Sequence, residues 1–216
     1  MSSLLNSGLY AITDPKLLNE HSLFTKVEYA LKGGCRVLQY RDKPASANQK
    51  LERARALKAL CRQYNAQLII NDDLELCLQS EADGVHLGKS DGDILEARKI
   101  LGPTRILGVT CHSDINYAQQ CIQLGVDYCA FGRMFTSKTK PEAPPCPLSV
   151  LKEAVKLGKP IVAIGGITLD NIESLMHTPL YSAAVIHGLF AQPDIEATAQ
   201  QFKQRLSNQQ HSFNYL

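Results

Sequence analysis

The sequence predicts a single (β/α)8 barrel, in which eight parallel strands form a closed barrel surrounded by helices, over residues 1–216. Eight short β-type runs alternate with helical stretches, and successive runs start about 25 residues apart, the length of a compact βα unit. No Pro- or Ser-rich linker and no block of like charge interrupts the alternation. An open doubly wound sheet is the alternative. The count of eight and the lack of a GxGxxG motif after the first run favour the barrel.

The eight runs, several of them almost continuously apolar, predict strands that are buried on both faces of a parallel sheet. In chain order the predicted strands are 9–13, 36–40, 67–71, 84–87, 105–110, 128–131, 161–164 and 183–187. The stretches that follow them predict helices at 18–32, 47–64, 73–80, 93–101, 115–124, 148–157, 169–176 and 194–206. The polar segment 208–216 is expected to be a loose tail.

Residue spacing and capping signals support these helices. Leu51, Ala54, Leu57 and Cys61 lie three or four positions apart, as residues on one face of a helix do. Residues that suit an N-cap precede several stretches, and glycines that suit a C-cap follow several others. They include Asp114, Thr168, Asp194, Gly102, Gly125 and Gly158.

The composition is that of a folded protein whose partners are small molecules. With 44% hydrophobic and 20% charged residues, the chain is able to build a core of its own. The formal net charge is +2, tryptophan is absent and aromatic residues make up 6%, which disfavours nucleic acid or an anionic membrane as partner. No apolar stretch has the length of a membrane span, and residues 1–14 do not resemble a signal peptide.

The chain has seven cysteines at irregular spacing, without a CxxC pair. An odd, irregular set fits neither a disulfide framework nor a zinc site, so the cysteines are expected to be reduced and mostly buried. Together with the absence of a signal peptide, this predicts a cytoplasmic protein.

Reactive side chains cluster directly after the predicted strands. Because the active sites of such barrels lie at the carboxyl ends of the strands, the cluster predicts a functional rim. It includes Gln39, Arg41, Lys43, Asn71, Asp72, Lys89, Asp91, Thr110, His112, Arg133, Ser137, Lys138, Thr139, Lys140, Gly165, Gly166, His187 and Gly188.

A magnesium site is predicted within this rim. Asp72 and Asp91 follow neighbouring strands, and Mg²⁺ prefers one or two carboxylates together with phosphate oxygens and water. Arg41 and Lys43, two positions apart, are placed to neutralise the same polyphosphate from the other flank. The alternative for each charge taken singly is a solvated loop position or a helix cap.

Two further segments predict phosphate binding. Gly165-Gly166 and 186–188 follow the last two strands, where barrels of this kind often hold a phosphate on backbone N–H groups. The long connection 132–147 combines hydroxyl and ammonium side chains with four prolines and is predicted to be a lid. The alternatives are a plain strand-to-helix turn and a disordered surface loop.

A side-chain nucleophile is not predicted. Cys111 and His112 are the one candidate pair, and adjacent residues of an extended strand point to opposite faces. His86, within a predicted strand, is expected to be a hydrogen-bonded core histidine.

Motifs along nearly the whole chain resemble the thiamine-phosphate synthase family. They are LYAITD (9–14), LQYRDK (38–43), LIINDD (68–73), ADGVHLGKSD (82–91), ILGVTCH (106–112), FGRMFTSKTKP (131–141), VAIGGIT (162–168) and AVIHGLF (184–190). The resemblance implies the barrel fold. It also implies a transferase that couples 4-amino-2-methyl-5-hydroxymethylpyrimidine diphosphate with 4-methyl-5-(2-phosphoethyl)thiazole to give thiamine phosphate and diphosphate.

The resemblance also implies roles for particular residues. Asp72 and Asp91 match the Mg²⁺ ligands, and Arg41, Lys43 and Lys140 match cations that stabilise the leaving diphosphate. The residues that match contacts to the pyrimidine diphosphate are Gln39, Arg41, Lys43, Asn71, Thr110 and Lys140. Those that match the thiazole phosphate site are Ser137, Thr139, Gly166, Ile186 and His187. Tyr40, Asp42 and Lys138, within the same motifs, complete the expected substrate-binding set.

Three positions depart from the family pattern. Thr110 and His187 stand where serine is common, and Lys89 stands where glutamine is common. Two other functions are possible alternatives: a thiazole tautomerase on the same barrel, which would not need the diphosphate and metal residues, and a sensor of phosphorylated ligands. The sequence leaves open whether the chain forms a homo-oligomer.

Overall fold

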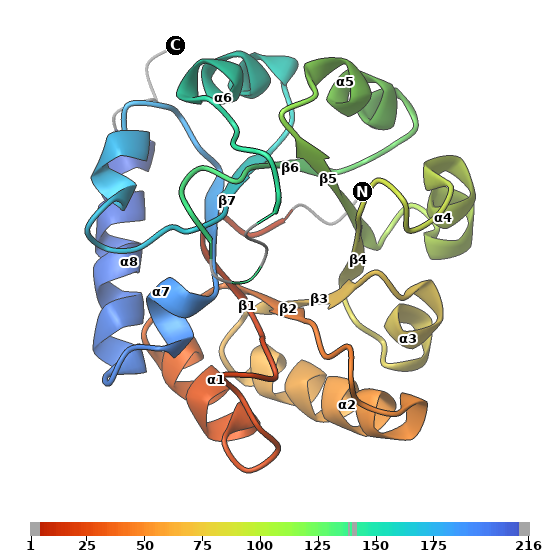
Figure 1. Cartoon of the computed structure of the whole chain (residues 1–216). Coiled ribbons are helices and arrows are strands. Elements are labelled where there is room, and N and C mark those ends of the chain that lie inside the picture. Colours follow the sequence, from red (N-terminus) through yellow and green to blue (C-terminus); the bar gives the residue numbers. More distant parts are fainter. Residues whose placement is uncertain (1–4, 138, 140–141, 212–216) are drawn as a thin grey trace.

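The computed structural model describes residues 5–137, 139 and 142–211, and it confirms the predicted (β/α)8 barrel. Eight parallel strands pair in sequence order, and β8 closes the barrel against β1 (Figure 1). The strands are β1 Gly8–Ile12, β2 Val37–Tyr40, β3 Gln67–Asn71, β4 Gly84–Leu87, β5 Ile106–His112, β6 Tyr128–Phe131, β7 Ile161–Ile164 and β8 Ser182–Val185.

Helices surround the barrel, and most begin at a residue that caps them. The side chains of Ser46, Asp73, Asp93 and Asp114 each accept a hydrogen bond from a backbone N–H in the first turn that follows. The helices are α1 Leu23–Lys32, α2 Ala47–Gln63, α3 Leu74–Gln79, α4 Ile94–Leu101, α5 Ile115–Gln123, α6 Leu148–Ala154, α7 His187–Phe190 and α8 Ile195–His211, with short 3-10 turns η1 Val155–Leu157 and η2 Ile172–Leu175.

The elements differ from the sequence prediction at both sides of β8. The helix predicted at 169–176 is only the 3-10 turn η2, because the Asn171 side chain bonds the backbone of Thr168 and Gly166 and competes with helical bonding. The last strand ends at Val185, and α7 follows where the strand was predicted to continue. The predicted loose tail is wrong for residues 208–211, which continue α8 because neither Gly nor Pro interrupts it.

Two layers of side chains form the core. The larger layer fills the space between the strands and the helices, and it includes Leu38, Leu57 and Val85. The smaller layer fills the inside of the barrel, where Tyr10, Ile69 and other alternate strand residues point inward. All seven cysteines are free and buried, as predicted.

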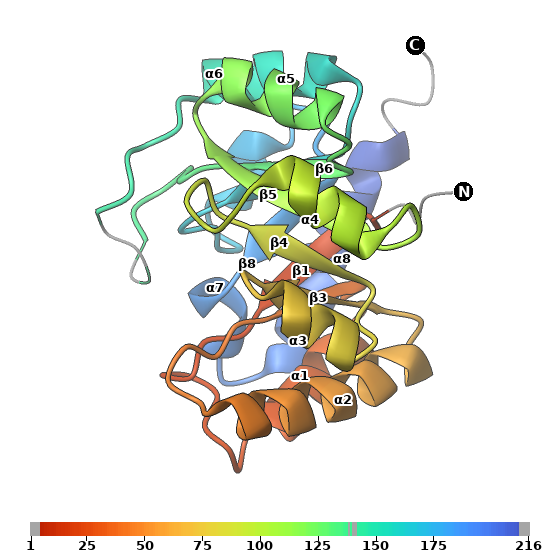
Figure 2. The same ribbon diagram turned by 90° about the vertical axis from the view of Figure 1, so that its right-hand side faces the viewer.

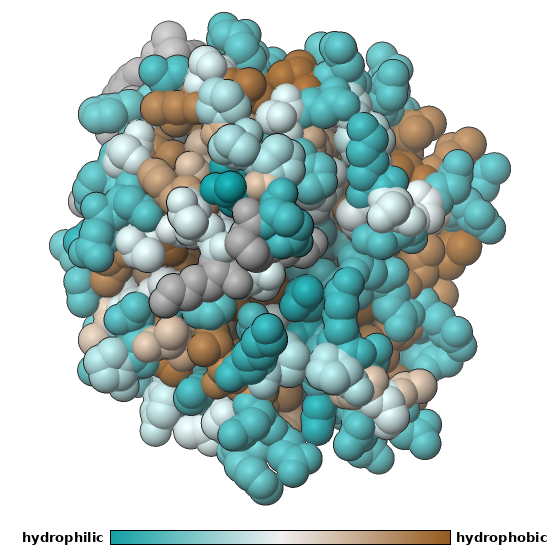
Figure 3. Space-filling model, in the orientation of Figure 1, coloured by the Kyte–Doolittle hydropathy of each residue, from teal (hydrophilic) through white to brown (hydrophobic). Residues whose placement is uncertain are grey.

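The carboxyl ends of the strands form one open end of the barrel, here called the mouth. In side view, the described part of the 132–147 loop and helix α7 both project from this end (Figure 2). Hydrophilic side chains cover most of the face around the mouth (Figure 3). Within the described residues, no helix is long and apolar enough to cross a membrane.

Candidate active site

A cavity of about 450 Å³ opens at the mouth and is lined by residues from all eight strands or the loops that follow them. The sequence prediction that the reactive residues gather there is largely correct. The predicted substrate-binding residues that line the cavity are Gln39, Arg41, Asn71, Thr110, Ser137, Thr139, Gly166, Ile186 and His187.

The backbone of Arg41 is held in place by Thr13, a buried residue that follows β1. The Thr13 hydroxyl accepts a hydrogen bond from Arg41 N at 2.8 Å and donates one to Arg41 O at 3.0 Å. The backbone N–H and carbonyl groups of Arg41 are therefore both satisfied by a single side chain from the end of the neighbouring strand. This anchors the start of the β2–α2 loop and directs Arg41 toward the cavity.

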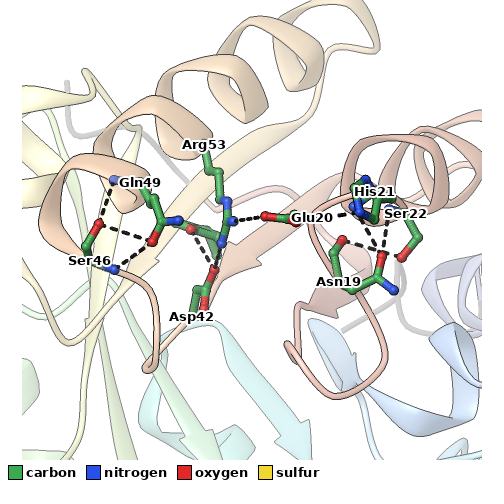
Figure 4. A network of polar contacts seen from close by, with 9 residues as sticks. Asn19, Glu20, His21, Ser22, Asp42, Ser46, Gln49 and Arg53 are labelled. Carbon is green, nitrogen blue, oxygen red and sulfur yellow. Dashed lines mark hydrogen bonds and ion pairs between the residues drawn. The ribbon is translucent and has the colours of Figure 1, made fainter.

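Tyr40 and Asp42, which were expected to contact substrate, do not line the cavity. The Tyr40 hydroxyl donates to Asp42 Oδ2 at 3.1 Å, and Arg53 Nη1 of α2 lies 2.7 Å from the same oxygen. Arg53 also pairs with Glu20, so a polar network joins the loops after β1 and β2 (Figure 4). The two residues support the loop that carries Arg41 instead of facing the cavity, because neighbouring residues of an extended segment point to opposite sides.

Asp72 and Asp91 lie together beside the cavity, as predicted for a shared cation. Burial, together with the neighbouring Asp91 carboxyl, raises the pKa of Asp72 above its usual value. Asn71 Nδ2 donates to Asp72 Oδ2 at 2.6 Å, and Lys43 Nζ lies 3.8 Å from the same oxygen. Asp91 accepts a hydrogen bond from Gly88 N at 2.8 Å, which closes its loop.

The two carboxylates suit a hard divalent cation. Among the described residues, no group of three or more His, Cys, Asp or Glu side chains is arranged to hold a metal by itself. Two neighbouring carboxylates leave coordination positions for phosphate oxygens and water, which is the usual arrangement for Mg²⁺. The donor set therefore fits magnesium held jointly with a phosphorylated substrate.

Lys89, the residue that departs from the family pattern in this loop, turns away from the carboxylates. Its Nζ lies 3.3 Å from Asp114 Oδ2 and 4.8 Å from the centre of the Tyr117 ring. The added charge is thus paired with α5, and it ties the Asp91 loop to that helix.

The opposite wall of the cavity is formed by the segments that follow β6, β7 and β8. Thr139 Oγ1 lies 3.3 Å from His187 Nδ1, so the described part of the 132–147 loop contacts the start of α7. Ser137 Oγ accepts from Thr139 N at 3.3 Å. Lys138 and Lys140 lie outside the described residues.

The glycines after β7 are required for packing as well as for any phosphate contact. Gly166 has a φ of +64°, and a Cβ there would overlap the backbone of Phe135 and Thr136. Met134 N and Phe135 N donate to the carbonyl oxygens of Ile164 and Gly165, so the loop after β6 runs tightly beside the loop after β7. The sequence predicts phosphate binding for these glycines, and the structure adds close approach of a second chain segment.

Three side chains at the floor of the cavity were not predicted as site residues: Tyr10, His86 and Tyr128. They form a chain of hydrogen bonds, each 2.8 Å long, between Gln39 and Thr110. His86 is hydrogen-bonded, as expected, but it also lines the cavity. Burial raises the pKa of both tyrosines well above the usual value, so they stay protonated. The sequence signal that could have found them is strand alternation, which points Tyr10 on β1 and Tyr128 on β6 into the barrel.

The site does not contain a nucleophile–base pair from Cys111 and His112. His112 lines the cavity, whereas Cys111 is buried in the core between the barrel and the helices, and its contact with Cys129, together with burial, raises its pKa. The prediction that the two residues point to opposite sides is correct. Cys111 and His112 therefore do not act together as a nucleophile and its base.

Fold and site together define a (β/α)8-barrel enzyme whose active-site cavity takes small molecules. Comparison with known sequences narrows this class. The chain belongs to the thiamine monophosphate synthase family, whose sequence model matches residues 9–189. It is accordingly a transferase of thiamine biosynthesis, as the motifs predicted.

Individual relatives agree with this assignment. The chain is 52% identical to the thiamine-phosphate synthase of Alcanivorax borkumensis, covering 90% of this chain and 91% of the relative. It is 47% identical to the thiamine-phosphate synthase of Marinobacter nauticus, covering 98% and 96%. Among solved structures, thiamine phosphate pyrophosphorylase from Pyrococcus furiosus matches with a TM-score of 0.86 at 30% identity, covering 94% of this chain and 96% of that one.

Proposed function

We propose that the chain joins 4-amino-2-methyl-5-hydroxymethylpyrimidine diphosphate to 4-methyl-5-(2-phosphoethyl)thiazole, releasing diphosphate and forming thiamine phosphate. The observation that carries the proposal is a cavity with polar groups on two opposite sides. Cationic and amide groups from β2 and β3 face the hydroxyl and glycine groups that follow β6 and β7. Such a cavity holds one phosphorylated substrate against each wall and brings the two reacting centres together between them.

The pyrimidine diphosphate is placed on the wall formed by β2, β3 and β5. Gln39 and Thr110 lie deep in the cavity and are suited to the heterocycle and the first phosphate. Arg41, held by Thr13, and Lys43 at the rim supply positive charge for the diphosphate. Lys140 is proposed as a third cation from the sequence alone.

Asp72 and Asp91 would hold Mg²⁺ against the same diphosphate. When bound, the ion would neutralise part of the negative charge that grows on the leaving diphosphate. Asn71 would orient Asp72 through the 2.6 Å hydrogen bond between their side chains.

The thiazole phosphate is placed on the opposite wall. Backbone N–H groups of Gly166, Ile186 and His187, with the hydroxyls of Ser137 and Thr139, supply uncharged donors for a phosphate monoester. His187 stands where serine is common, and this change has little effect on phosphate binding if the phosphate is bound by the backbone N–H. The imidazole of His187 also contacts Thr139.

The reaction proposed for these substrates is a dissociative substitution. The bond between the pyrimidine methylene carbon and the diphosphate oxygen breaks first, and the electron pair leaves with diphosphate. The thiazole nitrogen then donates its lone pair to the resulting cation. No side-chain nucleophile is needed. Arg41, Lys43 and Lys140 lower the barrier by stabilising the leaving group, and removing one such group typically reduces the rate about 10²–10³-fold.

We place this activity in the cytoplasm, because seven free buried cysteines fit a reducing compartment.

The test is direct coupling by the purified protein. The two substrates are mixed with protein and Mg²⁺, and thiamine phosphate is followed by mass spectrometry. We expect product with Mg²⁺, none with EDTA, and recovery after excess Mg²⁺ is added back. Absence of product under all conditions would overturn the proposed function, and EDTA-resistant product would overturn the metal assignment alone.

A further inference from the structure

The hydrogen-bonded chain at the cavity floor has a role that binding of substrate phosphates does not explain. It crosses the inside of the barrel from β2 to β1, β6, β4 and β5, in the order Gln39, Tyr10, Tyr128, His86 and Thr110. Its three middle members are all at least 93% buried, since their exposed fractions are 1%, 0% and 7%. Barrel interiors are usually filled by apolar side chains, so this buried polar chain requires a reason.

The chain has a definite direction. Gln39 Nε2 donates to the Tyr10 hydroxyl, and the one proton of Tyr10 then goes to Tyr128, its remaining partner among the described residues. Tyr128 in turn donates to His86 Nδ1. An imidazole that accepts at Nδ1 and is neutral carries its proton on Nε2, which donates to Thr110 Oγ1.

This direction fixes the polarity of the two ends that face the cavity. Gln39 uses its amide nitrogen for Tyr10, so its carbonyl oxygen is left as an acceptor toward the cavity. Thr110 accepts from His86, so its own hydroxyl proton is directed to the cavity as a donor. The reverse direction would present hydroxyl lone pairs to an anionic substrate, which is unfavourable.

We propose that Tyr10, Tyr128 and His86 are positioning residues that lock the Gln39 amide with its oxygen toward the cavity, and thereby select an aminopyrimidine over the corresponding oxopyrimidine. The 4-amino group can donate to the fixed oxygen, whereas a 4-oxo group would place two acceptors together. This inference rests on the proposed function, because it assigns the heterocycle of that reaction to the Gln39 end of the chain.

The first experiment measures substrate discrimination. In Tyr10→Phe, Gln39 loses the acceptor that fixes its amide, while the ring that fills the barrel is kept. We expect the ratio of kcat/KM for the aminopyrimidine diphosphate over its 4-oxo analogue to fall at least about tenfold relative to the unmodified protein. A ratio that does not change would overturn the positioning role.

Tyr181→Phe is the matched control. This tyrosine is half-buried, and its hydroxyl donates to Leu5 O at the other end of the barrel. Loss of that hydroxyl should leave the ratio within about twofold of the unmodified protein. An equal fall in both variants would mean that general loosening of the barrel is responsible.

The second experiment does not depend on turnover. Nitrogen NMR of protein with isotope-labelled histidine reports which ring nitrogen of His86 carries the proton, and His86→Gln identifies its signals. We expect the proton on Nε2, with Nδ1 unprotonated, in the unmodified protein near neutral pH. A proton on Nδ1 would overturn the proposed direction. If the protein couples neither pyrimidine, the proposed function is contradicted, and the NMR result alone decides the direction of the hydrogen-bonded chain.

Discussion

Asp72 illustrates how a single residue combines function with local instability. Its backbone is in the left-handed region, with φ of +64°, and its carboxyl is partly buried beside Asp91. Burial and the second carboxyl raise its pKa in the folded state. The unfolded residue ionises at lower pH, so its ionisation destabilises the fold above the folded pKa, and stability is recovered as pH falls through that value.

The first prediction follows from this destabilising effect of Asp72 ionisation. Asp72→Asn removes a proposed metal ligand but also the repulsion between the two carboxylates, and asparagine tolerates the left-handed backbone. We expect a drop in kcat of about 10²–10³-fold and, without metal, a higher Tm than the unmodified protein at neutral pH. The difference in Tm should shrink as pH is lowered. Thermal melts with EDTA, together with coupling assays, measure both effects.

Asp73→Asn is the control for this variant, because it removes one charge from the neighbouring residue while an asparagine still caps α3. It should couple at nearly the normal rate. A lower Tm in Asp72→Asn, or equal loss of activity in the two variants, would contradict the prediction.

Arg41 gives the second prediction at this scale. Arg41→Ala should lower kcat about 10²–10³-fold, because the proposed role of this cation is to stabilise charge that develops as diphosphate departs. Arg36 directly precedes β2 and does not line the cavity, so it provides the matched control: Arg36→Ala should keep kcat. If Arg41→Ala changes only the KM for the thiazole phosphate, Arg41 belongs to the other wall.

At the scale of elements, the predicted strand and helix positions are mostly correct because the apolar runs and caps are local signals. Strand ends differ from the prediction by two residues at most. The exceptions are the start of α1 and the turn η2, where side chains form hydrogen bonds with nearby backbone groups that the apolar pattern does not reveal. The start of α1 shifts to Leu23 because Asp14 and Asn19 accept backbone N–H groups in turns before it. The replacement of a helix by η2 depends likewise on Asn171.

The third prediction concerns the link between β1 and the β2–α2 loop. Thr13→Val keeps the shape of the side chain but leaves N and O of Arg41 without their partner. We expect a loss of unfolding free energy of about 1–3 kcal/mol and a kcat/KM about tenfold lower, because Arg41 is less well placed. Urea unfolding and steady-state kinetics measure these.

Thr198→Val is a matched variant, since the Thr198 hydroxyl also bonds a backbone carbonyl but lies in α8. It should lose stability without a fall in kcat/KM. The prediction is refuted if Thr13→Val is fully active.

At the scale of the whole molecule, the site could be predicted where it follows from one rule: in a (β/α)8 barrel, the active site lies at the carboxyl ends of the strands. Residues at the carboxyl ends of the strands gather at one mouth whatever their side chains are, which is why the sequence places Gln39, Asn71 and Thr110 there. Tyr40 and Asp42 were misplaced because motif position does not give side-chain direction. The floor of the cavity was missed because it depends on which residues of different strands meet across the barrel, and that follows from closure and register.

The fourth prediction tests this closure. A Cβ at Gly108 of β5 would overlap the Tyr128 ring that crosses from β6, so glycine at this position makes room for the ring. Gly108→Ala should lower the unfolding free energy by about 1–3 kcal/mol. In a double-mutant cycle with Tyr128→Ala, most of this loss should disappear, as measured by urea unfolding. Additive losses would show that the ring is not what excludes the methyl group.

The burial of all seven cysteines also determines how the molecule can be labelled. Burial raises the pKa of Cys35 to about 11 and that of Cys77 to about 12, so these thiols are unreactive while the protein is folded. A cysteine introduced at Glu142, an exposed position in the loop after β6, would then react selectively with a maleimide dye. The native cysteines do not compete for the dye, so the loop can be followed by fluorescence without removing any of them.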